Sequence, residues 1–218
     1  MNIITDIEKL SNRCDEVLDL RKENKIVQQI ILALKSKIRE DKLVGLAANQ
    51  LGFDKRIVVV AFGDDLRTFI NPIISNAEGL TVSVETCPSL PDKKFLRLRN
   101  QKVSVTYTDP LGKILTAKDL IGKAAAVVQE LIEHLDGVVL SDIGLELETD
   151  FDAASEEEKE ELIRAYCDSM DVKLKDTQAE IEATPELKKI SDAAKLLTKI
   201  QSGDVVIETS TVKKVKNN

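Results

Sequence analysis

The stretch from residue 56 to residue 107 reads as a series of β-strands, and it limits the folds open to this chain more than any other feature. Residues 57–61 (IVVVA) form an uninterrupted apolar run, and residues 68–74 form a second run that contains Pro72. Residues 80–85 and 101–107 alternate between apolar and polar side chains, which is the period of a half-buried strand. We therefore expect a sheet in the middle of the chain, with Pro72 at an edge or turn.

Helical patterns flank this region on both sides. Residues 1–42 are predicted to be helical because Ile26, Ile30, Leu34 and Ile38 recur at i, i+4 spacing among polar residues. Residues 120–140 carry a mostly apolar run that predicts a buried helix ended by Gly137. This second helix contains the only histidine of the chain.

Composition excludes several classes of protein. The aromatic fraction of 3% and the net charge of −7 disfavour a nucleic-acid partner, which needs stacking rings and positive charge. No apolar run approaches the ~18 residues of a membrane span, and no secretory signal is expected. The three cysteines, Cys14, Cys87 and Cys167, lie far apart and indicate neither disulfides nor a zinc knuckle. We expect a cytoplasmic protein without nucleic-acid or membrane partners.

Three short segments, spaced along the chain, carry the residues that could bind a metal or take part in catalysis. They read Gly45-Leu46-Ala47-Ala48-Asn49-Gln50, then Glu85-Thr86-Cys87-Pro88-Ser89, then Gln129-Glu130-Leu131-Ile132-Glu133-His134-Leu135-Asp136-Gly137. In order and separation they resemble the peptide deformylase motifs GxGLAAxQ, EGCLS and QHExDHLxG. The resemblance covers roughly residues 1–147 and implies an α+β fold, in which antiparallel strands surround a central helix that bears the metal ligands.

The resemblance also implies an activity and a site. Deformylases use Fe²⁺ or Zn²⁺ to remove the N-formyl group from the first methionine of nascent bacterial chains. Cys87 and His134 match two metal ligands, and Gln50 matches the amide that donates to the formyl oxygen. Glu130 stands at the position of the other histidine ligand, so a metal would meet thiolate, imidazole and carboxylate. We expect Zn²⁺ or Fe²⁺ binding there to be weak or absent.

Two further positions depart from the family pattern. Leu131 replaces the glutamate that moves the proton, and Glu133 cannot substitute because it points about 200° away around the helix. Pro88 follows the cysteine where the family supplies a backbone N–H, and proline has none to donate. A lost base costs about 10²–10⁴ in rate, and a lost oxyanion donor about 10²–10³. Efficient deformylation is therefore expected to be absent.

The composition changes beyond the third motif, and we expect an extension at residues 148–218 after a deformylase-like domain at residues 1–147. Ser155-Glu156-Glu157-Glu158 is a capping box that opens a long acidic helix. Thr184-Pro185 predicts the start of a second helix, which gives a helical hairpin. This hairpin is either a solvated packing element or an arm for a protein partner or self-assembly.

Three functions follow from these observations. The first is a catalytically degenerate deformylase-like protein with a binding or assembly role, encoded by a phage or carried in a virion. The second is a metal-dependent deformylase with an altered Cys87, Glu130 and His134 site. The third is a non-catalytic binder of formyl-methionyl peptides that uses the surviving cleft. The sequence alone favours the first, because ligand, base and oxyanion donor are all changed.

Overall fold

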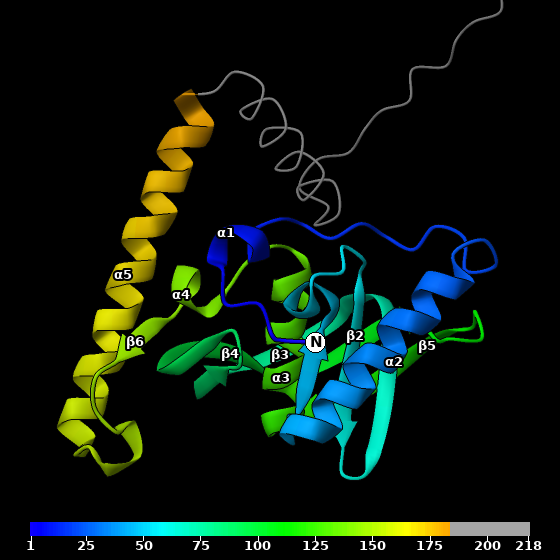
Figure 1. Cartoon of the computed structure of the whole chain (residues 1–218). Coiled ribbons are helices and arrows are strands. Elements are labelled where there is room, and N and C mark those ends of the chain that lie inside the picture. Colours follow the sequence, from blue (N-terminus) through cyan, green and yellow to red (C-terminus); the bar gives the residue numbers. More distant parts are fainter. Residues whose placement is uncertain (184–218) are drawn as a thin grey trace, which may run out of the picture. The chain divides into compact units, whose positions relative to one another are not determined.

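The computed structural model describes residues 1–183 and the side chains of residues 1–170 (Figure 1). One compact unit comprises Met1–Cys167 and a second begins at Asp168. The predicted second helix of the extension, from residue 184, lies outside the described residues.

The first unit contains a six-stranded antiparallel sheet. Its strands follow the order β1-β2-β3-β4-β5, and β6 pairs with β4. Their bounds are Gly45–Ala47 (β1), Ile57–Phe62 (β2), Asp65–Cys87 (β3), Leu90–Thr108 (β4), Ile114–Ile121 (β5) and Leu145–Leu147 (β6). The predicted α+β class is confirmed.

The described residues also form helical segments. Their bounds are Ile7–Leu10 (α1), Asn24–Asp41 (α2), Ala48–Leu51 (η1, a 3₁₀ turn), Gly122–Leu135 (α3), Leu140–Ile143 (α4), Phe151–Ala153 (η2, also 3₁₀) and Glu156–Ala183 (α5). The capping box at the start of α5 is confirmed, because the Ser155 hydroxyl accepts from the Glu158 N–H and the Glu158 carboxylate accepts from the Ser155 N–H. Gly137, with φ of 78°, follows the end of α3 as expected.

The β2 run is apolar throughout because helices cover it on both faces. Val58 and Val60 pack in one core cluster with residues of α3, whereas Ile57 and Val59 pack in a second cluster with residues of α2. A strand buried on both faces has no polar side, so its sequence shows no alternation. Helix α3 therefore lies against one face of the sheet, with its buried side toward β1, β2 and β4.

One expectation about local structure was wrong. Residues 1–6 and 11–23 are not helical. In residues 11–23, backbone groups pair with distant partners: the Cys14 N–H donates to the Leu135 carbonyl, and the Val17 N–H donates to the Asn71 side chain. Pro72 lies at an edge of the sheet as expected, because β2 pairs with β3 only up to Ile70. Asn71 and Pro72 lie in a bulge between the paired residues Ile70 and Ile73, where a missing N–H costs no ladder bond.

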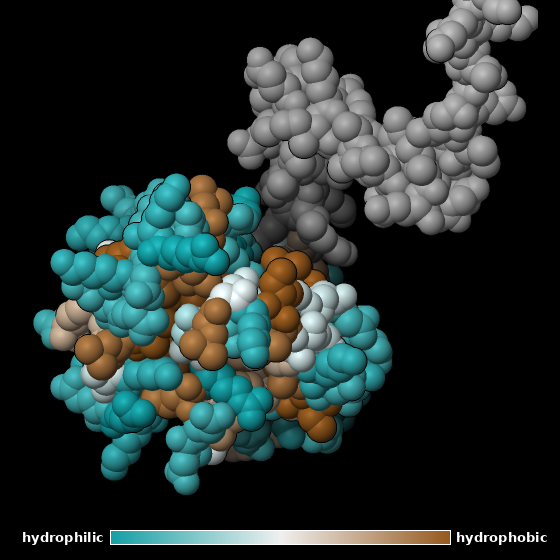
Figure 2. All heavy atoms as spheres, turned by 90° about the vertical axis from the view of Figure 1, so that its right-hand side faces the viewer, coloured by the Kyte–Doolittle hydropathy of each residue, from teal (hydrophilic) through white to brown (hydrophobic). Residues whose placement is uncertain are grey.

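On the face drawn in Figure 2, groups of apolar side chains are exposed among hydrophilic ones. Such scattered exposure is normal for protein surfaces. Within residues 1–183 we find no helix with the length and apolarity needed to span a bilayer.

Candidate metal centre

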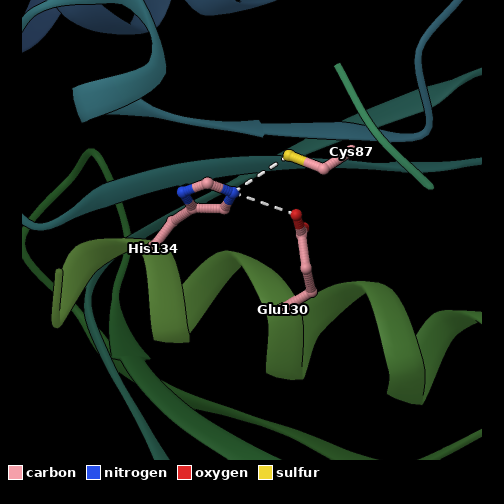
Figure 3. A group of neighbouring side chains, drawn as sticks. All are labelled: Cys87, Glu130 and His134. Atoms are coloured by element: carbon pink, nitrogen blue, oxygen red, sulfur yellow. Dashed lines mark hydrogen bonds and ion pairs between the residues drawn. The ribbon is translucent and has the colours of Figure 1, made fainter. Parts of the chain in front are cut away.

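Three side chains predicted to be metal ligands converge at one point (Figure 3). Glu130 and His134 lie one turn apart on α3 and therefore share a face of that helix, while Cys87 is the last residue of β3. His134 Nε2 lies 3.1 Å from Cys87 Sγ and 3.0 Å from Glu130 Oε1. One candidate ligand atom from each residue lies within 4.8 Å of the other two.

This donor set fits a divalent metal ion. Glu130 Oε1 is buried and has no hydrogen-bond partner among the described residues, although it faces the imidazole. Buried polar atoms in proteins are normally satisfied, so an orphaned carboxylate oxygen beside a thiol and an imidazole is the arrangement expected of a ligand. Thiolate, imidazole and carboxylate are all ligands of zinc and of first-row metals such as iron.

Burial controls the charge state of these groups. It raises the pKa of the Cys87 thiol well above its usual range, and the Glu130 carboxylate adds to this effect. Burial also opposes ionisation of Glu130, yet His134, Cys87 and Arg99 together lower the pKa of that carboxyl. Burial thus opposes ionisation of the Cys87 thiol, and a bound cation would favour its thiolate form.

Gln50 points its amide at this cluster. Its side chain is fully buried at the first turn after β1, and Oε1 accepts a hydrogen bond from the Ala47 N–H at 2.9 Å. This bond fixes the orientation of the amide, so that Nε2 donates toward Cys87 Sγ at 3.4 Å and Ser89 Oγ at 3.2 Å. The structure thus brings Gln50 to the same site as the three candidate ligands.

Leu131 and Pro88 both line a cleft that Glu130 and Gln50 line as well. Leu131 is 2% exposed and packs in the core cluster around α3. Glu133 points away from the cleft and pairs with Arg97 and Arg99, so it supplies no carboxylate to replace the missing base.

A buried charge network, which the sequence interpretation missed, connects the two ligand-bearing segments. Arg99 donates to both oxygens of Glu85 at 2.7 Å and also bonds Glu133, so it joins the residue two before Cys87 to the residue just before His134. Arg97 bonds the same Glu133 oxygen at 2.9 Å. A sequence signal for this network was present, because Arg97 and Arg99 occupy alternate positions of β4 and their side chains therefore lie on the same face of the strand.

The cleft has a volume of about 770 Å³. It runs between residues 81–86 of β3 and the part of α3 that carries Val127, Glu130 and Leu131. Strand β2 pairs with β3 only over Asp65–Ile70, and residues 81–85 pair with β4 on one side. Within the described residues, no strand covers the other edge of this part of β3, so its backbone groups are open to an extended peptide.

The three cysteines should differ sharply in reactivity. Burial, followed by the Asp54 carboxylate, raises the pKa of Cys14 to about 11, which leaves ~0.1% thiolate at pH 8. Cys87 is buried and its pKa is raised as well, whereas Cys167 is exposed. We expect one fast-reacting thiol in a disulfide-exchange assay of the metal-free native protein at pH 8, and none in a Cys167→Ser variant. All three should react in denaturant, and two fast thiols in the native chain would contradict the buried site.

Comparison with known proteins points to the same family as the geometry of the site. The sequence profile described as polypeptide deformylase matches residues 2–148. A peptide deformylase of Caldicellulosiruptor bescii is 37% identical over 145 residues, which cover 62% of this chain and 84% of the relative.

Two solved structures share the fold. The PDF of the Vibrio parahaemolyticus bacteriophage VP16T, solved in complex with actinonin, is 31% identical with a TM-score of 0.58, and the match covers 64% of this chain and 99% of that one. The peptide deformylase of Thermotoga maritima is 28% identical with a TM-score of 0.56, and covers 65% and 94%. With the profile spanning more than half of its length, this chain belongs to the polypeptide deformylase family.

Proposed function

We propose that this protein is a metal-dependent peptide deformylase with an altered ligand set, which acts slowly on formyl-methionyl chain ends. The convergence of Cys87, Glu130 and His134, with Glu130 lining the cleft, is the observation that carries the proposal. A Cys/Glu/His set differs from the family pattern by one ligand, and carboxylate-containing sets serve catalytic zinc in other hydrolases. The family relationship and the intact cleft support the same activity.

The residues of the chain would divide the work as follows. Cys87, Glu130 and His134 would hold the ion, which when bound polarises a carbonyl and lowers the pKa of water. Gln50 Nε2 lies beside Cys87 and would donate to the formyl oxygen as negative charge develops on it. The open edge of β3 would hold the peptide in an extended conformation by backbone hydrogen bonds.

Turnover should be slow because two functions of the family site have no replacement. The Leu131 side chain has no group that can accept a proton, and Glu130 is used as a ligand. Pro88 offers no N–H beside the formyl oxygen. Losing the base alone lowers the rate by about 10²–10⁴.

The burial of Leu131 favours a second candidate, a protein that binds formyl-methionyl peptides without hydrolysing them. The Leu131 side chain packs in the core, so it forms a rigid apolar part of the cleft wall. Such a protein would use its cleft for recognition, in a phage or virion setting or with a partner on the C-terminal helices. These settings remain predictions of the sequence.

Metal analysis of the purified protein tests the site. After incubation with Zn²⁺, or with Fe²⁺ under anaerobic conditions, we expect ~1 ion per chain to remain after gel filtration. Cys87→Ser and His134→Ala should each weaken binding by at least about 100-fold, since even outer contacts of a metal contribute 10–100-fold. Cys167→Ser is the matched control and should bind like the unchanged chain. A metal-free protein after both treatments would rule out the metalloenzyme.

An assay on formyl-Met-Ala-Ser with the metal-loaded protein separates the two candidates. Formate release above the rate of metal in buffer, absent from His134→Ala, is expected of the slow enzyme. Peptide binding that favours the formylated form, without formate release, would instead identify the binder.

A further inference from the structure

The first part of the C-terminal extension contributes to the cleft. Phe151 and Asp152 line it together with residues of β3 and α3, yet they lie beyond residue 148, where the family profile ends. Phe151 is half-buried and Asp152 is exposed, so the two residues stand at the rim of the cleft rather than at its floor.

A single guanidinium group holds the segment that carries Phe151 at both ends. Arg97 Nη1 donates to the Ile143 carbonyl at 2.7 Å, just before β6, and to the Tyr166 hydroxyl at 2.8 Å, on α5. Arg97 is 8% exposed and Tyr166 is 4% exposed, so these bonds form in a buried environment. The residues between them therefore form a loop closed onto β4, rather than a free tail.

Local contacts fix the shape of this loop. Strand β6 pairs with Lys94–Leu96 of β4, and Lys94 Nζ lies 3.8 Å from Asp150 Oδ1. The Asp150 side chain accepts from the Asp152 N–H and so caps the short η2 turn that contains Phe151. Phe151 therefore lies between two anchored elements, the paired strand β6 before it and the capped helix α5 after it.

The cleft lining carries exposed apolar side chains besides Phe151, among polar and charged residues. Val44 is 43% exposed and Val84 is 36% exposed, and both line the cleft with Phe151. Exposed apolar side chains grouped in a concave site mark a place where apolar ligand groups are buried. In the proposed function the candidate ligands mark the position of the formyl group of the bound peptide. Leu131 and Val127 lie beside Glu130 in the cleft lining. A residue at the rim, such as Phe151, would therefore contact a peptide residue after the first methionine.

We infer that Phe151 is a specificity-determining residue that selects chain ends with a large apolar side chain after the first methionine. This inference rests on the proposed function for the identity of the ligand. It adds that the selectivity comes from the extension and not from the family motifs. A chain end with small residues after the methionine would leave the Phe151 ring in contact with water and gain nothing from it.

Fluorescence anisotropy with labelled peptides tests the inference on the full, metal-loaded chain. We expect formyl-Met-Leu-Leu-Lys to bind more tightly than formyl-Met-Gly-Gly-Lys. Phe151→Ala should raise the Kd of the leucine peptide about tenfold, the low end of the contribution from burying one such side chain, and change the glycine peptide less than about twofold. Phe151→Leu should keep most of the preference. The matched control is Phe62→Ala, which removes a partly buried ring from β2, outside the cleft lining.

Unformylated copies of both peptides distinguish this inference from the proposed function. If the formyl group makes no difference but Phe151→Ala still removes the leucine preference, the selectivity of the rim stands and the deformylase proposal fails. If Phe151→Ala leaves the preference intact, or weakens both peptides equally while the melting temperature is unchanged, Phe151 is not the selecting residue. Failure of all four peptides to bind the unchanged chain would overturn the inference as well.

Discussion

A Leu131→Glu variant loaded with metal should remove formyl groups about 10²–10⁴ times faster than the unchanged chain. Leu131 follows Glu130 on α3 and lines the cleft, so a carboxylate at this position would reach the space where the peptide is expected to lie. It would supply the proton acceptor and donor that the present site lacks. Formate release from formyl-Met-Ala-Ser, followed with time, is the measurement.

Leu131→Gln is the control for this variant. Glutamine has nearly the size and polarity of glutamate but moves no proton, so its rate should stay near that of the unchanged chain. Both variants lose the same packing in the core around α3, and their melting temperatures should fall together. Pro88 remains in both, so the Leu131→Glu rate should still lie below that of a full family site by about 10²–10³.

Equal rates for folded, metal-loaded Leu131→Glu and Leu131→Gln would contradict the proposed enzyme. The cleft would then not hold a formyl group within reach of α3, and the binding function would be the better account of the geometry.

An Arg99→Met variant should lose about 3–5 kcal/mol of unfolding free energy. The Arg99 side chain is 2% exposed and neutralises both Glu85 and Glu133, whose side chains are 9% and 27% exposed. Methionine fills a similar volume but leaves the Glu85 carboxylate buried without a counter-charge, and Glu133 keeps only Arg97. Urea denaturation of the metal-free protein, with the m-value checked for constancy, measures the loss.

Lys93→Met is the matched control, because Lys93 lies on the same strand as Arg99 and the change breaks its ion pair with Glu146 of β6. Those side chains are 47% and 49% exposed, and solvent-exposed pairs contribute about 0–1 kcal/mol. A loss below about 1 kcal/mol for Arg99→Met would mean that the buried network contributes little more than a surface pair. The network would then not serve to hold the Cys87 strand against the His134 helix.

Local patterns in the sequence were sufficient for most of the secondary structure of the first unit. The amphipathic part of α2 carries the periodicity of a helix, and the short run of β-branched residues in β2 is typical of a buried strand. The non-helical path of residues 11–23 was not predictable in this way. Its backbone groups bond to Leu135 and Asn71, which lie far along the chain and leave no local signal.

The sequence by itself determined which residue types could form the site, because the three motifs place a cysteine, a glutamate, a histidine and a glutamine at family positions. It also determined what the site lacks, since no fold can give Leu131 a proton to move or Pro88 an N–H. Only the tertiary structure decided that Glu130 meets Cys87 and His134, with its Oε1 buried 3.0 Å from His134 Nε2. Only there does Arg97 join Glu133 to Tyr166, two residues 33 positions apart in sequence. Hydrogen bonds and ion pairs depend on distances in space, and a sequence records such distances only between residues of the same local element.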